Sequence, residues 1–183
     1  MESLQGSFLI STAKMPDPRF REKLIFMCGH TEEGAIGLVV NNPLPDVGLE
    51  EILKSADIPL PDFELPPVYL GGPVEMGSGF ILYTADYQTA SQMQVSETVY
   101  LSSDPSVLQD IAAGRGPGRY LFLLGYAGWG PGQLEGELTD NGWLILPAED
   151  EVIFSTPDAL KWKVAARKHG IDIATFGDVI GSA

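Results

Sequence analysis

The stretch Tyr120–Glu137 constrains this chain most, because an apolar run ends abruptly in alternating glycines. It reads YLFLLGYAGWGPGQLEGE. Its first part, Tyr120–Tyr126, is rich in aromatic and branched residues, which predicts a central strand buried on both faces. Gly128, Gly130 and Gly132 follow, and glycine permits a positive φ and the close approach of another group to the backbone. We therefore predict that the strand ends in a glycine loop with a cleft beside it.

Carboxylate and amide side chains follow the glycines, and aromatic side chains lie among them, so we expect both kinds to line the cleft. Carboxylates such as Glu135 and Glu137 can bind a divalent cation or share a proton, and freed backbone N–H groups can hold an anion. The structural alternative is a tight turn in which the glutamates face water and Trp129 covers the core. The predicted ligand-binding residues are Gly72, Tyr126, Gly128, Trp129, Gly130, Gln133, Glu135, Glu137 and Asn141.

Three further features each have a functional and a structural interpretation. Gly71–Gly72–Pro73, with Gly77 and Gly79, marks a second close approach of the backbone, either between two packed loops or to a ligand. His30 is either a general base or a turn histidine satisfied by neighbouring carboxylates. Cys28 lies in an apolar run, where we expect an inert core thiol. The basic side chains of the last helix are expected to form its solvated face or a partner surface: Lys161, Lys163, Arg167 and Lys168.

Composition narrows the class of protein. A length of 183 residues predicts one domain over residues 1–183. The 11 basic and 25 acidic residues give a net charge of −14, which disfavours direct binding to nucleic acid or anionic membranes. One cysteine allows neither an internal disulfide nor a cysteine-based zinc site. No run of eighteen apolar residues and no signal peptide is found, so we expect a soluble cytoplasmic protein.

Strands are predicted to outnumber helices and to follow one another through short turns, one of them at His30–Gly34. Helices are expected at Leu49–Ser55, from Pro105 to Ala113 with Asp104 as N-cap, and at Asp158–Lys168. This pattern predicts an α+β fold with a bent, mixed, largely antiparallel sheet and flanking helices. The remaining predicted strands are Ser7–Ile10, Lys23–Cys28, Ile36–Asn41, Val68–Leu70, Gly79–Thr84, Thr98–Ser102, Trp143–Leu146 and Glu151–Phe154.

Several catalytic and cofactor motifs are absent from the sequence. It contains no P-loop, no G-x-S-x-G nucleophile elbow and no H-E-x-x-H zinc motif. The glycine run is one glycine short of the dinucleotide-binding pattern. We therefore predict no cofactor and no metal centre.

The order of motifs resembles that of the YqgE/AlgH family over nearly the whole chain. The glycine stretch carries Gly125–Gly130 followed by Gly132–Glu135, and the other matching segments agree in order. The resemblance implies a bacterial cytoplasmic single domain with a bent mixed sheet. It implies no activity, although one branch of the family is described as a transcriptional regulator. The other matching segments are His30 with Gly34–Leu38 and Asn41, Tyr69–Val74, Gly79–Phe80, Trp143 and Gly170–Asp172.

Three functional hypotheses remain. The first is a binding or regulatory domain that receives a small ligand or a protein partner in the glycine-rich cleft. The second is an enzyme that uses Glu135 or Glu137 as acid, base or cation ligand. The third is a regulator that binds DNA directly, which the acidic composition opposes. We favour binding over catalysis, and the sequence leaves the oligomeric state open.

Overall fold

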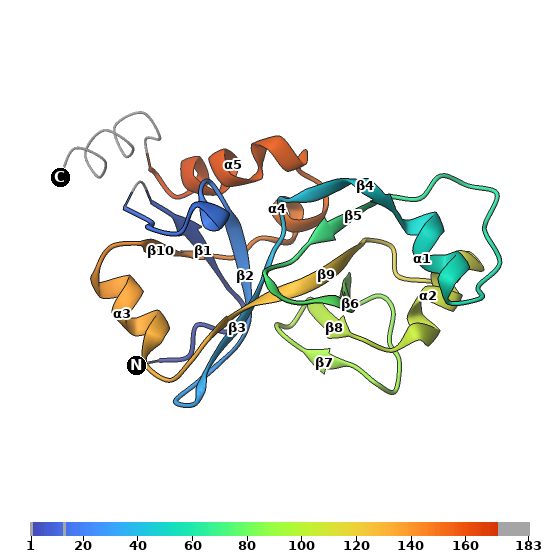
Figure 1. Cartoon of the computed structure of the whole chain (residues 1–183), viewed down its shortest axis with the longest axis horizontal. Coiled ribbons are helices and arrows are strands. Elements are labelled where there is room, and N and C mark those ends of the chain that lie inside the picture. The colour runs from blue at the N-terminus through green and yellow to red at the C-terminus, as the bar shows by residue number, and fades with distance from the viewer. Residues whose placement is uncertain (1, 13, 172–183) are drawn as a thin grey trace.

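One large sheet forms the framework of the protein (Figure 1). The computed structural model describes residues 2–12 and 14–171, so Asp172 of the motif above lies outside the described residues. Within them, the sheet order is β10-β1-β2-β3-β9-β6-β8-β7, with β4 paired to β5 and β5 paired to β9. The strands are β1 Ser7–Ser11, β2 Leu24–Thr31, β3 Gly34–Val39, β4 Pro43–Gly48, β5 Pro67–Leu70, β6 Val74–Thr84, β7 Met93–Gln94, β8 Val99–Ser102, β9 Tyr120–Trp129 and β10 Trp143–Pro147.

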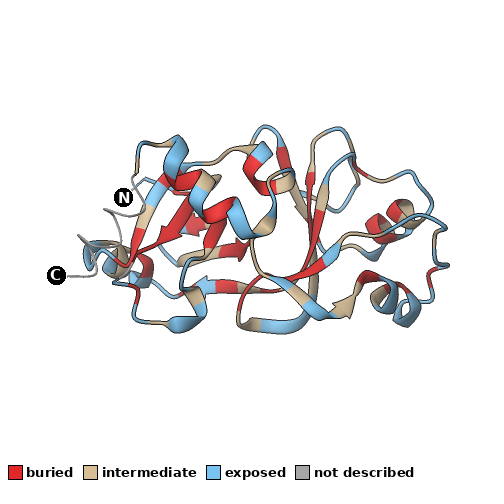
Figure 2. Cartoon of the chain, turned by 90° about the horizontal axis from the view of Figure 1, so that it is seen from above, coloured by how far each residue is buried: buried red, intermediate tan, exposed pale blue. Residues whose placement is uncertain are grey.

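Helices cover the sheet at three places, each over its own hydrophobic cluster. Helices α4 and α5 pack on the strands near β1 and β2, α3 closes the opposite face of those strands, and α1 and α2 cover the far end (Figure 1). Figure 2 shows buried residues along the strands and on the inner sides of helices. The helices are α1 Leu49–Ser55, α2 Pro105–Ala112, α3 Gln133–Thr139, α4 Asp150–Phe154 and α5 Lys161–Lys168, with 3₁₀ turns η1 Pro18–Phe20 and η2 Asp158–Leu160. None of the helices in the described residues is both long and apolar enough to cross a membrane.

Strand β9 joins the two halves of the sheet. Its first half pairs with β5 and β6, whereas Ala127–Trp129 pairs with β3. Between these segments Gly125 has a φ of +74°, a conformation that L side chains rarely adopt, and the strand bends there. Among the described strand pairs, β5–β9 is parallel and the others are antiparallel. The predicted α+β fold with a bent, mixed, largely antiparallel sheet is therefore confirmed.

The connection from β5 to β6 crosses β9 in direct backbone contact. A Cβ atom on Gly72 would lie 2.0 Å from the carbonyl carbon of Tyr126, and one on Gly71 would lie 2.4 Å from the carbonyl oxygen of Gly125. The Gly71 N–H also donates a hydrogen bond of 2.8 Å to the carbonyl of Leu124. These glycines are therefore needed for the packing of two backbone segments, one of the two interpretations that the sequence allowed.

The glycine stretch differs from its prediction. Strand β9 continues through Gly128 to Trp129, and of the three predicted glycines only Gly132 has a positive φ, +74°. The residues after it form helix α3, which the sequence reading missed. The reason is that α3 has seven residues and contains Gly136, so it gives too short and too weak a helical pattern to be recognised.

Three local predictions were wrong. Glu151–Phe154 is not a strand but part of helix α4, because short apolar runs do not distinguish strand from helix and Val152 and Ile153 are buried from a helical turn. The predicted turn at His30–Gly34 is shorter, since β2 runs to Thr31. Lys161 is not on a solvated helix face: its side chain is 1% exposed and its ammonium donates to the Val40 carbonyl at 2.8 Å.

The crossing of Gly72 over β9 predicts a strong effect of one added methyl group. We expect Gly72→Ala to lower the free energy of unfolding by about 3 kcal/mol, because its Cβ overlaps the Tyr126 backbone. Gly77→Ala is the control, since a Cβ there meets no atom within 4 Å, and its effect should stay below about 0.5 kcal/mol. Urea unfolding measures both, and equal stabilities would contradict the packing role of Gly72.

Candidate functional site

An open groove lies beside the C-terminal end of β9, and we call it the Tyr126 groove. Its volume is about 520 Å³. The half-buried side chains of Ile36, Val74 and Tyr126 contribute much of its wall. Phe80 packs edge-on against Tyr126, with ring centroids 6.0 Å apart, and so fixes one wall. The groove is lined by Gly29, His30, Thr31, Glu33, Gly34, Ala35, Ile36, Val74, Tyr126, Gly128 and Trp129.

Glycine keeps the Tyr126 groove open at one point on its floor. Gly128 is exposed, and a Cβ built on it would lie 3.3 Å from Cε2 of Tyr126 and 3.8 Å from Cγ2 of Val74. Its φ lies outside the left-handed region, so the backbone itself accepts a side chain there. A larger residue at this position would occupy the groove. Three of the predicted residues, Tyr126, Gly128 and Trp129, are thus brought together.

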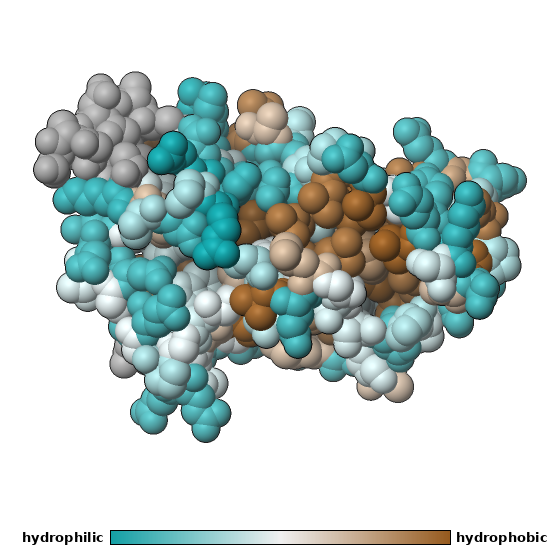
Figure 3. All heavy atoms as spheres, viewed as in Figure 1, coloured by the Kyte–Doolittle hydropathy of each residue, from teal (hydrophilic) through white to brown (hydrophobic). Residues whose placement is uncertain are grey.

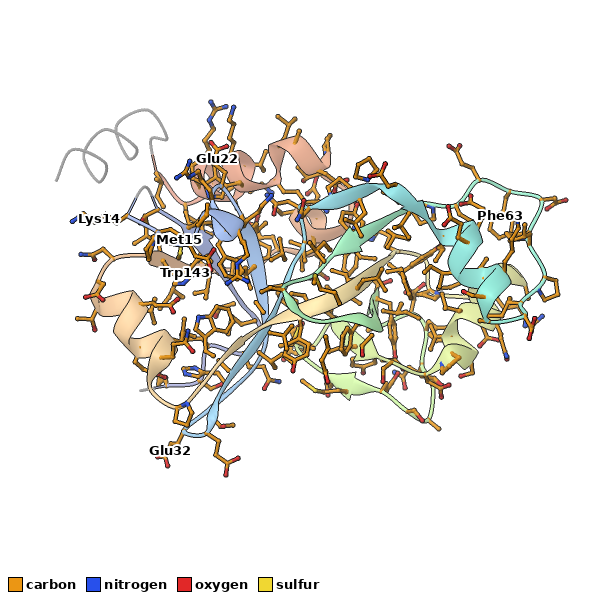
Figure 4. The ribbon with its side chains drawn as sticks, in the orientation of Figure 1. Lys14, Met15, Glu22, Glu32, Phe63 and Trp143 are labelled. Carbon is orange, nitrogen blue, oxygen red and sulfur yellow. The ribbon has the colours of Figure 1, made fainter. Side chains whose placement is uncertain are left out.

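Glu137 has a structural role. Its Oε1 atom accepts hydrogen bonds from the indole N–H groups of Trp129 at 3.1 Å and Trp143 at 2.8 Å. Its Oε2 atom accepts from the amide of Gln133 at 3.1 Å. Trp143 is 1% exposed, and Figure 4 shows it in the interior beside α3. This carboxylate therefore ties α3 to the core, and both of its oxygens are occupied within the fold.

Glu135 faces a second hollow, of about 540 Å³, which we call the Glu135 hollow. Its Oε1 atom lies 2.7 Å from Nε2 of His30, which is buried. The other ring nitrogen, Nδ1, accepts a hydrogen bond of 3.0 Å from the backbone N–H of Leu4. Because Nδ1 acts as an acceptor, the proton of the neutral ring is on Nε2 and is donated to Glu135. The hollow is lined by Ser3, His30, Thr31, Glu32, Gly132 and Glu135.

This pairing limits the acid and base chemistry of the site. The hydrogen bond from His30 holds the pKa of the Glu135 carboxyl below its ordinary value of 4.5, so this group is ionised at neutral pH. His30 has no free nitrogen lone pair for a general base, because Leu4 occupies Nδ1.

Burial raises the pKa of Cys28 to about 12, as expected for an inert core thiol. Within residues 2–12 and 14–171, no three His, Cys, Asp or Glu side chains cluster as metal ligands would.

The other predicted residues have contacts within the fold. Gly130 donates its backbone N–H to Oε1 of Gln133 at 3.0 Å. Asn141 has a φ of +61° just beyond the C-terminal end of α3, and its carbonyl accepts a 2.5 Å hydrogen bond from the Thr12 hydroxyl. Gly72 packs on Tyr126, as described above. Gln133 and Glu137 line a smaller hollow of about 250 Å³ that adjoins Trp129.

Several residues of the Tyr126 groove come from outside the predicted stretch. Ile36 and Val74 line it because β3 and the start of β6 flank the end of β9, and Gly29 of β2 pairs with Ile36. Ile36 and Val74 belong to motifs that matched the YqgE/AlgH family. The order of these motifs was therefore the sequence signal that could have identified them as groove residues. The pairing of His30 with Glu135 joins residues 105 positions apart, and the sequence reading had instead assigned His30 to neighbouring carboxylates.

The contacts of Glu137 predict a large loss of stability on truncation. Glu137→Ala leaves two buried indole N–H groups without their acceptor, at about 1–3 kcal/mol each, so we expect a loss of about 2–6 kcal/mol. Glu137→Gln retains an acceptor and should lose less. Glu51→Ala, at an exposed position of α1, is the matched control. Urea unfolding followed by tryptophan fluorescence measures all three, and a Glu137→Ala protein as stable as the control would contradict this role.

The His30–Glu135 pair predicts a defined tautomer and a pH dependence. Imidazole ¹⁵N shifts of the neutral ring should show His30 as the Nε2–H tautomer. The carboxyl of Glu135 should titrate below 4.5, and His30→Asn should move its midpoint upward. Since the folded pKa is lowered, the stabilisation is complete above pH 4.5 and is lost as the pH falls through the folded pKa. A protonated Nδ1, or a Glu135 midpoint unchanged in His30→Asn, would contradict the pairing.

Comparisons with known proteins agree with the fold and the motifs. The AlgH-like family model matches residues 8–174. A UPF0301 protein of Desulfotalea psychrophila is 41% identical over 181 residues, which cover 99% of this chain and 95% of that protein. A UPF0301 protein of Paracoccus denitrificans is 43% identical over 174 residues, which cover 93% of this chain and 92% of that protein.

Two solved structures share the architecture. The solution structure of the AlgH protein from Pseudomonas aeruginosa aligns with a TM-score of 0.78 at 37% identity, covering 94% of this chain and 92% of that chain. A crystal structure of a Corynebacterium diphtheriae protein, 18% identical, aligns with a TM-score of 0.73, covers 94% of this chain and 90% of that chain, and shows the same fold. The family match spans most of the chain and includes the motifs around the Tyr126 groove. The chain belongs to the AlgH-like family.

Proposed function

We propose that this protein is a non-catalytic binding domain that receives an apolar group of a small ligand or of a partner protein in the Tyr126 groove. The observation that carries the proposal is the groove itself, with about 520 Å³ of space beside Ile36, Val74 and Tyr126. Ligand sites commonly have volumes of roughly 300–1,000 Å³ and mainly apolar walls. Any regulatory effect of the protein would then follow from this binding.

The exposed glycine supports the proposal. Gly128 neither requires a left-handed backbone nor meets a backbone atom of another segment at its Cβ position. A side chain at this position would enter the groove and press against the Tyr126 ring, whose Cε2 atom lies 3.3 Å from the Cβ position. The absence of a side chain there preserves space that a ligand group can use.

Negative charge at the rim of the Tyr126 groove favours a ligand that carries a cation next to its apolar group. Glu33 lines the groove and is exposed, and Glu32 extends into solvent at the tip of the β2–β3 turn (Figure 4). Figure 3 shows hydrophilic atoms over this tip and hydrophobic atoms nearer the middle of the same face. With a net charge of −14, the protein attracts cationic ligands and repels phosphate backbones at long range. A ligand that joins an apolar group to an ammonium or guanidinium fits both features.

The alternatives have weaker support. An enzyme using Glu137 would need a carboxylate whose oxygens are free, and both are bonded to Trp129, Trp143 and Gln133. Glu135 borders a hollow, but its lowered pKa makes it a poor proton donor at neutral pH. Direct DNA binding would require the acidic surface to be overcome by phosphate contacts, and salt-dependent affinity would reveal them.

A substitution that fills the groove tests the proposal. A panel of arylalkylamines and the corresponding carboxylic acids is titrated into the protein and followed by ¹⁵N amide shifts. We expect the amines to bind more tightly than the acids, to shift Gly29, Ile36 and Gly128, and to stabilise the fold by about 2.7 kcal/mol at one hundred times Kd. Gly128→Leu should weaken binding at least about tenfold, the equivalent of 1.4 kcal/mol.

The matched control places the same side chain away from the groove. Gly136 lies on the exposed face of α3, where a Cβ meets no atom within 4 Å. The Gly136→Leu variant should therefore bind the amines as tightly as the original protein does. Binding that persists in Gly128→Leu, or shifts confined to other regions, would reject the Tyr126 groove as the site.

A further inference from the structure

A small hollow with basic walls lies at the opposite end of β2 from the Tyr126 groove, and we call it the basic hollow. It has a volume of about 210 Å³ and lies between the turn before β2 and the η2–α5 segment. Glu22 in that turn is seen beside α5 in Figure 4. The side chains used below are those of Arg21, Lys23, Asn41, Asp158, Trp162 and Lys163, all of which line the hollow.

The local charge is opposite in sign to that of the whole chain. Arg21, Lys23 and Lys163 line the hollow in a protein with 11 basic and 25 acidic residues. One of its two carboxylates, Asp158, is already neutralised, because the Lys161 ammonium lies 2.8 Å from its Oδ1 atom. The hydroxyl of Tyr69 also donates to this carboxylate, at 2.8 and 3.0 Å from its two oxygens.

Three cations therefore face one uncompensated carboxylate, that of Glu22. Within the described residues, neither Arg21, Lys23 nor Lys163 has a carboxylate oxygen within 4.0 Å of its side-chain nitrogens. Burial lowers the pKa of Lys23, and the charge of Glu22 only partly opposes this effect. A partly desolvated ammonium without an ion pair is costly, and a bound anion would reduce that cost.

Hydrogen bonds fix the backbone segments that carry the basic side chains. Asn41 accepts a hydrogen bond of 3.0 Å from the Leu24 N–H and donates one of 3.0 Å to the Glu22 carbonyl. These bonds hold the turn that carries Arg21 and Lys23, in which Glu22 has a φ of +53°. On the other side, the indole of Trp162 donates to the Ser11 carbonyl at 3.3 Å and anchors the helix that carries Lys163. A backbone that is already held in place loses less entropy when a ligand binds.

We propose that the basic hollow binds a small phosphate-type oxyanion, either the free ion or the phosphate group of a small ester. Its volume lies below the roughly 300 Å³ of typical drug-sized sites, which suits a single charged group better than a nucleotide. The net charge of the chain does not prevent this, because charges beyond about 8 Å are largely screened at physiological ionic strength. Strand β2 has eight residues, so roughly 25 Å separates this site from the Tyr126 groove.

The test measures binding of inorganic phosphate and of glycerol 3-phosphate by calorimetry and ¹⁵N shifts, with chloride at matched ionic strength as reference. We expect saturable binding that shifts Lys23, Asn41 and the Trp162 indole. Lys163→Glu should weaken it at least about tenfold. Lys54→Glu changes the net charge equally on an exposed face of α1 and should leave binding within about twofold.

Each outcome decides the proposal. Tighter binding of the ester identifies a phosphorylated small molecule as the source of the anion, and equal binding identifies the free ion. Shifts no larger than those caused by chloride, or equal losses in Lys163→Glu and Lys54→Glu, would overturn the site. Amine binding in the Tyr126 groove is measured on the same samples, so failure of one site is separable from failure of the other.

Discussion

The structure depends on one backbone crossing, in which the segment of Gly71 and Gly72 lies directly against β9. The crossing brings the ends of β3 and β6 to the two sides of β9, because Gly71 accepts a hydrogen bond from Val39 and donates one to Leu124. It also coincides with the bend at Gly125. The Tyr126 groove lies immediately beyond this crossing, because Val74 and Tyr126, which line it, pair next to the contact between Gly72 and β9.

The acidic side chains near α3 and the Tyr126 groove differ in whether their carboxylates are bonded within the fold. Glu137 accepts hydrogen bonds from two indoles and fastens α3 to the core, whereas Glu135 accepts a hydrogen bond from His30 and remains ionised. Glu33 lies on the rim of the Tyr126 groove with its charge exposed. Two of the three carboxylates thus have partners within the fold, and the third is the one that the proposed function pairs with a cation. This division favours recognition over acid–base catalysis.

The sequence predicted the sheet class, helix α1 and the N-cap of α2 well, because alternating apolar strands and an Asp-Pro pair are strong local signals. Helix α3 was missed, since its seven residues include a glycine. The partner of His30 and the burial of Lys161 were also mispredicted, because the contacts with Glu135 and Val40 span 105 and 121 positions. Within the site, the sequence located Tyr126 and its neighbours, but long-range strand pairing determines which residues complete the groove.

The central claim is that the Tyr126 groove takes an apolar group beside a cation. It is tested most directly by a crystal structure of the protein with a bound arylalkylamine. We expect the ring to lie between Ile36, Val74 and Tyr126, with the ammonium directed toward Glu33. A groove that stays empty while the amine binds elsewhere would contradict it.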